Sequence, residues 1–232
     1  MEIIGLDACK YGWCGIGYIN TKMVYGCFTN LNELMQKHPE LDRILIDIPI
    51  GLTSEKFKRT VDAEARTYLE KRKSSIFSPP CRDAIYAENY QQALAINRQV
   101  EGKGISIQAY NISAKIKEVD EWMNSKPEKA DIFEAHPELC FKTLNQYKDL
   151  EFSKHDKQGI EERQRLIFKH QKNLKKVYDQ LLKDYKRTQL KPDDILDAMA
   201  LYLINQESMD LKCISDKNDL DQTGKKVCIV YG

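Results

Sequence analysis

The run Arg43-Ile44-Leu45-Ile46-Asp47-Ile48-Pro49 is the stretch that decides the fold. Apart from its single acid it is almost continuously apolar, which is typical of a strand buried on both faces of a sheet. Such strands occur where helices cover both faces, so the run predicts an α/β protein. The acid inside it is costly to bury, and it is therefore the first candidate for chemistry.

The residues before this run predict a β-rich unit. Three short β-branched or aromatic runs, separated by turn-like residues, predict strands over Glu2–Ala8, Trp13–Asn20 and Met23–Thr29. Asn30 is expected to cap a short helix over Leu31–Lys37, which His38-Pro39 ends. The predicted order up to residue 50 is then β-β-β-α-β.

The residues after the run predict mostly helices. Residues 52–125 are rich in charge and are interpreted as a helical insertion, with helices over Val61–Lys73, Tyr86–Val100 and Ile107–Met123. Further elements are expected in the order strand, helix, helix, strand and strand, over Asp131–His136 (halted by Pro137), Gly159–Tyr185, Pro192–Asn205, Leu211–Ser215 and Lys226–Tyr231. The prediction is one domain over residues 1–232, with a mixed sheet of the order β-β-β-α-β…β-α flanked by helices on both faces.

Composition excludes several classes of protein. The chain has 232 residues, 42% hydrophobic, and a net charge of +1, which exclude a disordered chain and a uniformly basic nucleic-acid coat. No apolar run is long enough to span a bilayer, so no membrane partner is expected. The seven cysteines contain no CxxC pair and fit neither a disulfide framework nor a zinc site. With no signal-peptide pattern at the N-terminus, they favour the reducing cytoplasm.

Acidic side chains recur at the predicted strands and on the last helix. Asp7 ends the first strand, Asp47 lies in the central run, and Glu134 lies in the next strand. Asp194 and Asp197 are three residues apart, so both project from one helix face. Converging buried carboxylates need a cation, and Mg²⁺ or Mn²⁺ prefers oxygen ligands and supports phosphodiester hydrolysis. Each acid alone has a structural alternative, since an acid also suits a turn or a helix N-terminus.

Motifs that run nearly end to end carry a resemblance to a known family. They include Gly5-Leu6-Asp7-Ala8-Cys9, Ile46-Asp47-Ile48-Pro49-Ile50-Gly51-Leu52, Asp62-Ala63-Glu64-Ala65-Arg66, Gly102-Lys103-Gly104, Glu134-Ala135-His136-Pro137-Glu138 and Asp193-Asp194-Ile195-Leu196-Asp197-Ala198. In these motifs the chain resembles domain-of-unknown-function family 429, whose members are described as predicted nucleases of RNase H-like fold. The last motif also resembles the terminal helix of bacterial Holliday-junction resolvases, where Asp-x-x-Asp-Ala-x-Ala supplies metal ligands.

The resemblance implies roles for particular residues. RNase H-like nucleases generally place acids on the first strand, on a strand at or near the fourth, and on a late helix. The resemblance therefore implies that four residues are catalytic and bind Mg²⁺ or Mn²⁺, namely Asp7, Asp47, Asp194 and Asp197. It implies Glu134 as a fifth catalytic candidate. It also implies a nucleic acid or nucleotide-like phosphodiester as substrate, bound by Asp62, Arg66, Arg82, Gln108, Lys115 and Glu118. Ala8 replaces the glycine of many family members, so ordinary extended backbone is expected there.

Other functions remain open at this point. A non-catalytic nucleic-acid-binding protein would keep the same fold and bind in a salt-sensitive way without a metal. Phosphoryl transfer of the sugar-kinase or actin-like kind needs two such domains, for which the chain lacks room. Residues 154–191 carry twelve basic and five acidic side chains, and residues 193–221 carry eight acidic and two basic ones. The basic stretch suits either phosphate steering or a solvated helix surface, and self-association is left open.

Overall fold

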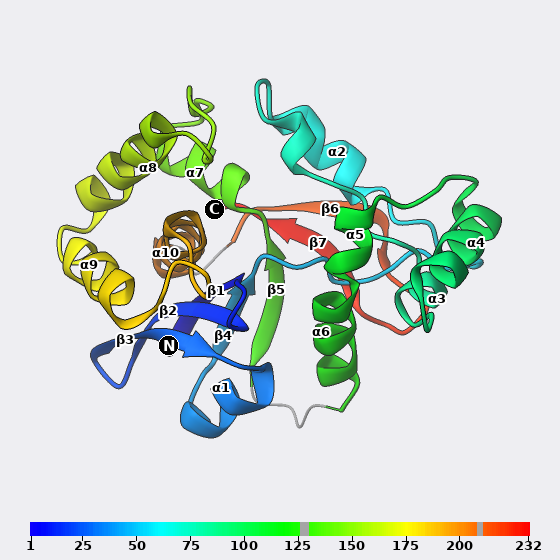
Figure 1. The fold of residues 1–232 in the computed structure, drawn as a ribbon, viewed down its shortest axis with the longest axis horizontal. Coiled ribbons are helices and arrows are strands. Elements are labelled where there is room, and N and C mark those ends of the chain that lie inside the picture. Colours follow the sequence, from blue (N-terminus) through cyan, green and yellow to red (C-terminus); the bar gives the residue numbers. More distant parts are fainter. Residues whose placement is uncertain (126–129, 208–210) are drawn as a thin grey trace.

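A seven-stranded mixed sheet forms the centre of the fold in the computed structural model, which describes residues 1–125, 130–207 and 211–232. Its order is β3-β2-β1-β4-β5-β7-β6, as Figure 1 shows in part. The strands are β1 (Ile3–Ala8), β2 (Trp13–Ile19), β3 (Lys22–Phe28), β4 (Arg43–Ile46), β5 (Asp131–Ala135), β6 (Cys213–Leu220) and β7 (Lys226–Val230). The pairs β1–β2, β2–β3 and β6–β7 are antiparallel, and β1, β4, β5 and β7 run parallel. The predicted α/β class with a mixed sheet is confirmed.

The first half of the scaffold follows the predicted β-β-β-α-β order. Helix α1 (Leu31–Lys37) lies between β3 and β4, and the side chain of Asn30 caps it by accepting a hydrogen bond of 2.9 Å from the backbone of Glu33. Strand β4 is shorter than the apolar run that predicts it, because it ends at Ile46 and leaves Asp47 just beyond its end. The acid therefore lies at the edge of the sheet, where side chains from neighbouring strands can meet.

The segment between β4 and β5 is helical, as predicted, but its helices are shorter. They are α2 (Val61–Tyr68), the 3₁₀ helix η1 (Lys73–Ser75), α3 (Arg82–Ile85), α4 (Tyr90–Glu101), α5 (Ile107–Asn111) and α6 (Ser113–Ser125). The helix expected over Tyr86–Val100 starts only at Tyr90, because Asn89 caps it and so fixes the start. Helices α3–α6 extend to one side of the sheet in Figure 1, while α2 packs against β6 and β7.

The C-terminal half corrects two predictions. Pro137 does not simply halt a strand, because it is the first residue of α7 (Pro137–Leu144), where proline's missing N–H is tolerated. The single helix predicted over Gly159–Tyr185 is wrong: α8 (Lys157–His170) and α9 (Leu174–Asp184) are separate, with extended backbone at Gln171. Helix α10 (Pro192–Glu207) matches the predicted last helix. Residues 208–210, within the acidic stretch, lie outside the described residues.

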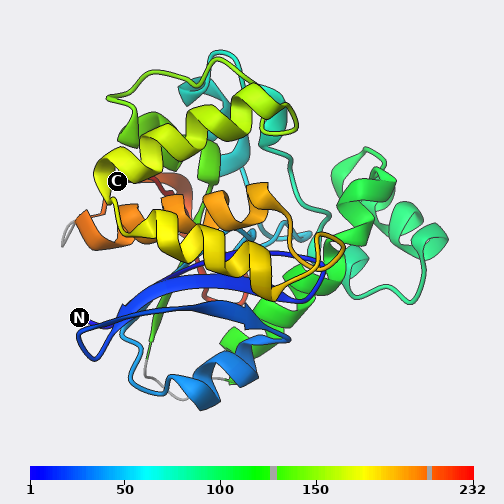
Figure 2. The same ribbon diagram turned by 60° about the vertical axis from the view of Figure 1, so that its left-hand side comes forward.

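Helices cover both faces of the sheet. One core lies between the sheet and α7–α10, and a second core lies on the other face under α1 and α6. Helix α10 is buried between the sheet and α7–α9, as Figure 2 shows. A Cβ atom added at Gly5 would lie 2.4 Å from the backbone nitrogen of Tyr202 and 2.6 Å from the carbonyl oxygen of Ala198. Glycine in β1 therefore permits the close approach of α10.

Two further observations concern the chemistry of the chain as a whole. The cysteines are free thiols, and most of them are buried in the core. Across the part of the chain that is described, no helix combines the length and apolar character needed to cross a lipid bilayer.

Candidate functional site

Two carboxylates meet at the ends of the central parallel strands. Asp7 is near the end of β1, and Asp47 follows β4 directly. The backbone N–H of Asp47 donates a 2.9 Å hydrogen bond to the carbonyl oxygen of Leu6, which extends the β1–β4 pairing by one residue. Both acids share the strand parity of Ile3 and Leu45, whose side chains pack on the side of α10. In open α/β sheets this edge, outside the carboxyl ends of the strands, is where ligands bind.

Helix α10 brings two more acids to the same place. Asp197 is only 1% exposed. Asp194 lies one turn earlier and accepts a 2.9 Å hydrogen bond from the backbone N–H of Lys191, at the start of the helix. We call Asp7, Asp47, Asp194 and Asp197 the acid cluster. The structure thus brings together the four residues predicted as metal ligands.

Electrostatic interactions link the members of the acid cluster. Burial raises the pKa of Asp7 well above its ordinary value, and the negative charges of Asp47 and Asp197 raise it further. Burial is also the main cause that raises the pKa of Asp47. The pKa of Asp194 is raised to about 6 by burial and then by its acidic neighbours Asp193 and Asp197. These shifts identify a group of carboxylates that is unfavourable when fully ionised without a cation.

A lysine supplies positive charge to the cluster. The Nζ atom of Lys154 lies 2.7 Å from Oδ2 of Asp197. The charge of Asp197, followed by those of Asp7 and Asp47, raises the pKa of the Lys154 ammonium. The other oxygen of Asp197, Oδ1, is buried and has no hydrogen-bond partner among the described residues. Sequence reasoning missed Lys154, and its only signal was its place as the first cation of the basic stretch 154–191.

His136 lies beside the cluster but is committed to the backbone. Its Nδ1 atom accepts a 3.3 Å hydrogen bond from the backbone N–H of Glu138 and so caps α7. The proton is then on Nε2, which lies 3.3 Å from the carbonyl oxygen of Ser75. If this imidazole took up a second proton, its positive charge would lower the pKa of the Asp47 carboxyl.

Glu134 is not brought together with the other predicted acids. It is paired in register with Ile46, so it points to the opposite face of the sheet from Asp7 and Asp47. There the Nη2 atom of Arg59 lies 2.6 Å from Glu134 and 2.7 Å from Asp62. The backbone N–H of Ile50 donates to the same glutamate at 2.7 Å. Glu134 and Asp62, which was predicted to bind substrate, thus form a buried triad with Arg59.

The two arginines predicted to bind substrate have partners within the protein. Arg82 is buried and lies 2.5 Å from a carboxylate oxygen of Asp120 and 2.6 Å from one of Asp221. These contacts join α3 and α6 to the β6–β7 turn. The Nε atom of Arg66 donates a 2.8 Å hydrogen bond to the carbonyl oxygen of Ile76. Both side chains therefore hold the segment between β4 and β5 in place.

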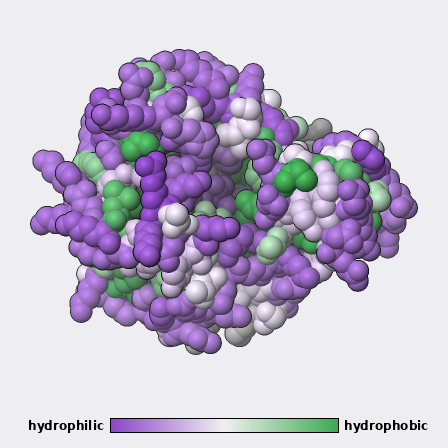
Figure 3. All heavy atoms as spheres, in the orientation of Figure 1, coloured by the Kyte–Doolittle hydropathy of each residue, from purple (hydrophilic) through white to green (hydrophobic). Residues whose placement is uncertain are grey.

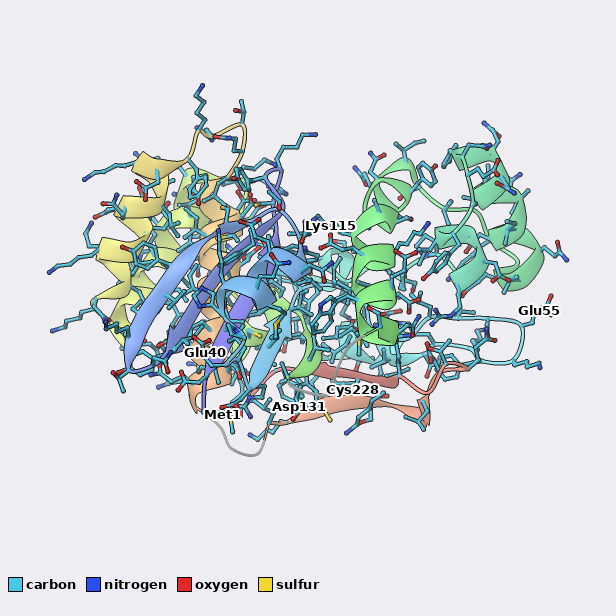
Figure 4. All side chains as sticks on the ribbon, turned by 90° about the horizontal axis from the view of Figure 1, so that it is seen from below. Met1, Glu40, Glu55, Lys115, Asp131 and Cys228 are labelled. Carbon is cyan, nitrogen blue, oxygen red and sulfur yellow. The ribbon has the colours of Figure 1, made fainter. Side chains whose placement is uncertain are left out.

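The remaining predicted substrate-binding residues lie on α5 and α6. Gln108 is exposed. Lys115 lies 2.9 Å from Glu118 and 4.6 Å from the ring centroid of Trp13, and Figure 4 shows it where α6 faces the strands. Glu118 accepts a 2.9 Å hydrogen bond from Nε1 of Trp13. Because Trp13 is paired with Ala8, this contact fastens α6 next to the β1 end that carries Asp7.

The acid cluster fits a divalent cation in the chemistry of its ligands. Carboxylate oxygens are what Mg²⁺ and Mn²⁺ prefer, and Oδ1 of Asp197 is a buried acceptor with no partner among the described residues. In the described part of the chain, however, no three His, Cys, Asp or Glu side chains are arranged so that they could hold a metal ion together. Lys154 supplies the positive charge in the arrangement that the structure shows.

The surface is hollowed in two separate places. Figure 3 shows the molecule hollowed between the part built by α7–α10 and the part built by α3–α5. A separate cavity of about 470 Å³ lies at the opposite end of the sheet from the acid cluster, where β4 and β5 begin. Met1, Asp131 and Cys228 line that cavity, as Figure 4 shows. None of the predicted site residues lines it.

Comparison with known protein families gives a match over most of the chain. A family model described as "Protein of unknown function (DUF429)" matches residues 5–215. No curated protein and no solved structure gives a significant match.

Proposed function

The chain belongs to the DUF429 family of proteins of unknown function, and on that premise we propose that it is a divalent-metal-dependent nuclease of RNase H-like fold. The observation that carries the proposal is the acid cluster. Three separate segments, β1, the end of β4 and α10, contribute carboxylates that burial and mutual repulsion make unfavourable when ionised alone. A cluster of this kind is favourable when it has a cation to bind.

The four acids have distinct tasks under this proposal. Asp7 and Asp47 would hold the ion from the sheet, and Asp197 and Asp194 would complete the shell from α10. Mg²⁺ or Mn²⁺ bound there would lower the pKa of a water and stabilise the leaving oxygen of a phosphodiester. The close approach of α10 to Gly5 keeps the two sets of ligands at a fixed separation.

Element order supports the RNase H-like assignment. The chain begins β-β-β-α-β, and its acids lie on the first strand, after the fourth strand and on a late helix. This is the placement that the resemblance to RNase H-like nucleases implies. Glu134 has no place in the ion's shell under this proposal, because it belongs to the Arg59 triad on the other face.

A nucleic acid is the substrate that the charge of the neighbouring helices favours. Lys176 and Lys183 on α9, and Arg187 after it, are exposed and have no ion pair within the described residues. Helix α9 is followed by the segment 186–191, which leads directly into α10. The last residue of this segment, Lys191, donates its backbone N–H to the carboxylate of Asp194. We call Lys176, Lys183 and Arg187 the α9 track. Exposed basic side chains on the segment that precedes the acid cluster are suited to bind the phosphate backbone of a nucleic acid.

The free cysteines support a cytoplasmic location. Thiols that stay unpaired are typical of a reducing compartment.

One observation favours a second candidate, a nucleic-acid-binding protein without catalysis. Lys154 already compensates part of the charge of the acid cluster, and a lysine fixed there would leave no need for a metal. Such a protein would use the α9 track to bind nucleic acid in a salt-sensitive way and would not turn over.

Cleavage of labelled single-stranded and double-stranded DNA and RNA, with Mg²⁺ or Mn²⁺, tests the proposal. We expect cleavage by the wild type and its loss in Asp7→Asn and Asp47→Asn. The matched control is Glu55→Gln, an equal change at an exposed acid far from the cluster, labelled in Figure 4. Binding without cleavage, unaffected by chelation of divalent ions, would favour the second candidate. Cleavage that survives both aspartate changes would contradict the proposed site.

A further inference from the structure

We propose that Lys154 is an exchangeable internal counter-ion of the acid cluster, whose ammonium must leave Asp197 before a divalent cation can bind. The inference rests on the proposed function and concerns what this chain's own residues do before the ion arrives. It makes the observed structure the resting state of the site.

The contact is between a partly exposed side chain and a buried one. Lys154 lies in the connection between α7 and α8, and 35% of its side chain is exposed. Its partner Asp197 is 1% exposed and lies on the buried helix α10. Lysine carries a compact charge on a flexible four-carbon stem, so it can swing toward solvent without any shift of the backbone. Asp197 has no such freedom, and Lys154 is therefore the partner that can leave.

Lys154 acts on three of the four members of the acid cluster and not on one acid alone. Its charge is felt by Asp7, Asp47 and Asp197. The other basic groups near the cluster are His136, which faces Asp47 and is bound to the backbone, and Lys191, which faces Asp194. Among these groups, Lys154 is the one with an ion pair to a member of the cluster among the described residues.

Asp197 retains capacity for a second partner. Lys154 occupies Oδ2, while Oδ1 is buried and has no hydrogen bond within the described residues. An unpaired buried carboxylate oxygen is costly, so the site is not at its most favourable with the lysine alone.

Mn²⁺ titration by calorimetry tests the exchange directly and needs no substrate. We expect Lys154→Met to bind Mn²⁺ roughly tenfold more tightly than the wild type, because no ion pair of modest strength has to be broken first. We expect the metal-free variant to melt at a lower temperature, because the acids lose their cation. Mn²⁺ should then raise its melting temperature by more than it raises that of the wild type.

Lys142→Met is the matched control. Lys142 forms a similar ion pair, 2.8 Å long, with the 5%-exposed carboxylate of Asp149, away from the cluster. That variant should lose stability while its Mn²⁺ affinity stays unchanged. Lys154→Gln serves as the second variant if the methionine change disturbs folding, and circular dichroism checks both.

The outcomes distinguish a failure of the Lys154 exchange from a failure of the proposed metal site. If wild type and Lys154→Met bind Mn²⁺ equally, or if the variant binds more weakly, the exchange is wrong and the metal site stands. If neither protein binds Mn²⁺ at all, the proposed metal site fails and the exchange fails with it. Tighter binding in Lys142→Met as well would show a general effect of lost lysines and would overturn the specific role of Lys154.

Discussion

The backbone N–H of Asp47 donates to the carbonyl oxygen of Leu6 at 2.9 Å, one residue beyond the last paired residues of β1 and β4. This hydrogen bond places the Asp47 carboxylate beside that of Asp7. Two acids on adjacent parallel strands thus share one buried edge, where burial and then the negative charge of Asp47 raise the pKa of Asp7.

Removal of one charge should therefore stabilise the metal-free protein. Burial, Asp47 and Asp197 raise the pKa of Asp7, so its ionised form opposes folding at neutral pH. We expect Asp7→Asn to raise the free energy of unfolding in the absence of metal, because the amide removes a carboxylate whose ionised form is unfavourable at this position. Thermal or denaturant unfolding in a chelator checks this. A loss of stability would mean that Asp7 is ionised and well compensated.

Uptake of Mn²⁺ should depend on pH near the pKa of Asp194. That pKa is raised to about 6, chiefly by burial. A metal ligand has to lose its proton, so affinity should fall as the pH drops through about 6 and rise above it. Calorimetric titrations between pH 5 and 8 would measure the change. Asp194→Asn should bind more weakly and lose this step, and an unaltered pH profile in that variant would contradict the assignment.

Asp221 should contribute to acid unfolding. Burial works to raise the pKa of Asp221, but hydrogen bonds from Thr223, Lys225 and Leu52 keep it below its ordinary value. A lowered folded-state pKa gives stability that is present above the unfolded value and is lost as the pH falls through the folded value. Asp221→Asn leaves Arg82 without one carboxylate partner and should cost about 3 kcal/mol at pH 7. The free energy of unfolding of Asp221→Asn should then decrease less steeply than that of the wild type as the pH is lowered.

Glu134→Gln should separate stability from metal binding. The change replaces one of the two Glu134 oxygens that accept hydrogen bonds from Arg59 with an amide group that cannot accept, so we expect a loss of about 2–3 kcal/mol in the free energy of unfolding. Mn²⁺ affinity should stay at the wild-type value, because Glu134 points to the opposite face from the acid cluster. A large loss of affinity in a variant that is still folded would restore Glu134 as a ligand.

The α9 track should account for much of the salt dependence of nucleic-acid binding. The triple change Lys176→Gln, Lys183→Gln and Arg187→Gln removes three cations, which should lower the slope of log affinity against log salt by about 2 for a single strand. Fluorescence anisotropy in a chelator measures binding without cleavage. The control is Lys22→Gln, Lys58→Gln and Lys226→Gln, three exposed lysines outside α9. Equal slopes in the two triples would show that the α9 track has no special role.

The acid cluster could be predicted from the sequence because its members lie in strongly patterned segments. An acid in or after an apolar run, as at Asp7 and Asp47, is visible without a structure. Glu134 looked equivalent by the same rule. Its orientation depends on the register between β4 and β5, which pairs it with Ile46, and that pairing cannot be obtained from local pattern.

Other features could not be predicted because they depend on distant contacts or on a helix break that leaves the helical spacing unchanged. Lys154 meets Asp197 across 43 residues, and nothing in either segment indicates the pairing. The break between α8 and α9 is hidden because the buried residues Ile167 and Leu174 are seven apart, so helical spacing continues across it. Pro137 is compatible with both the end of a strand and the start of a helix, and the structure shows it starting α7.

The close approach at Gly5 has a consequence for how this protein can lose its function. With a side chain there, α10 would have to move away from β1, because the added carbon would meet the backbone of Tyr202 and Ala198. That movement would separate Asp197 from Asp7 while every acid stayed in the sequence. The geometry of the site is thus vulnerable at a position that has no polar group and takes no part in the chemistry. A survey of inactivating substitutions limited to charged residues would overlook it.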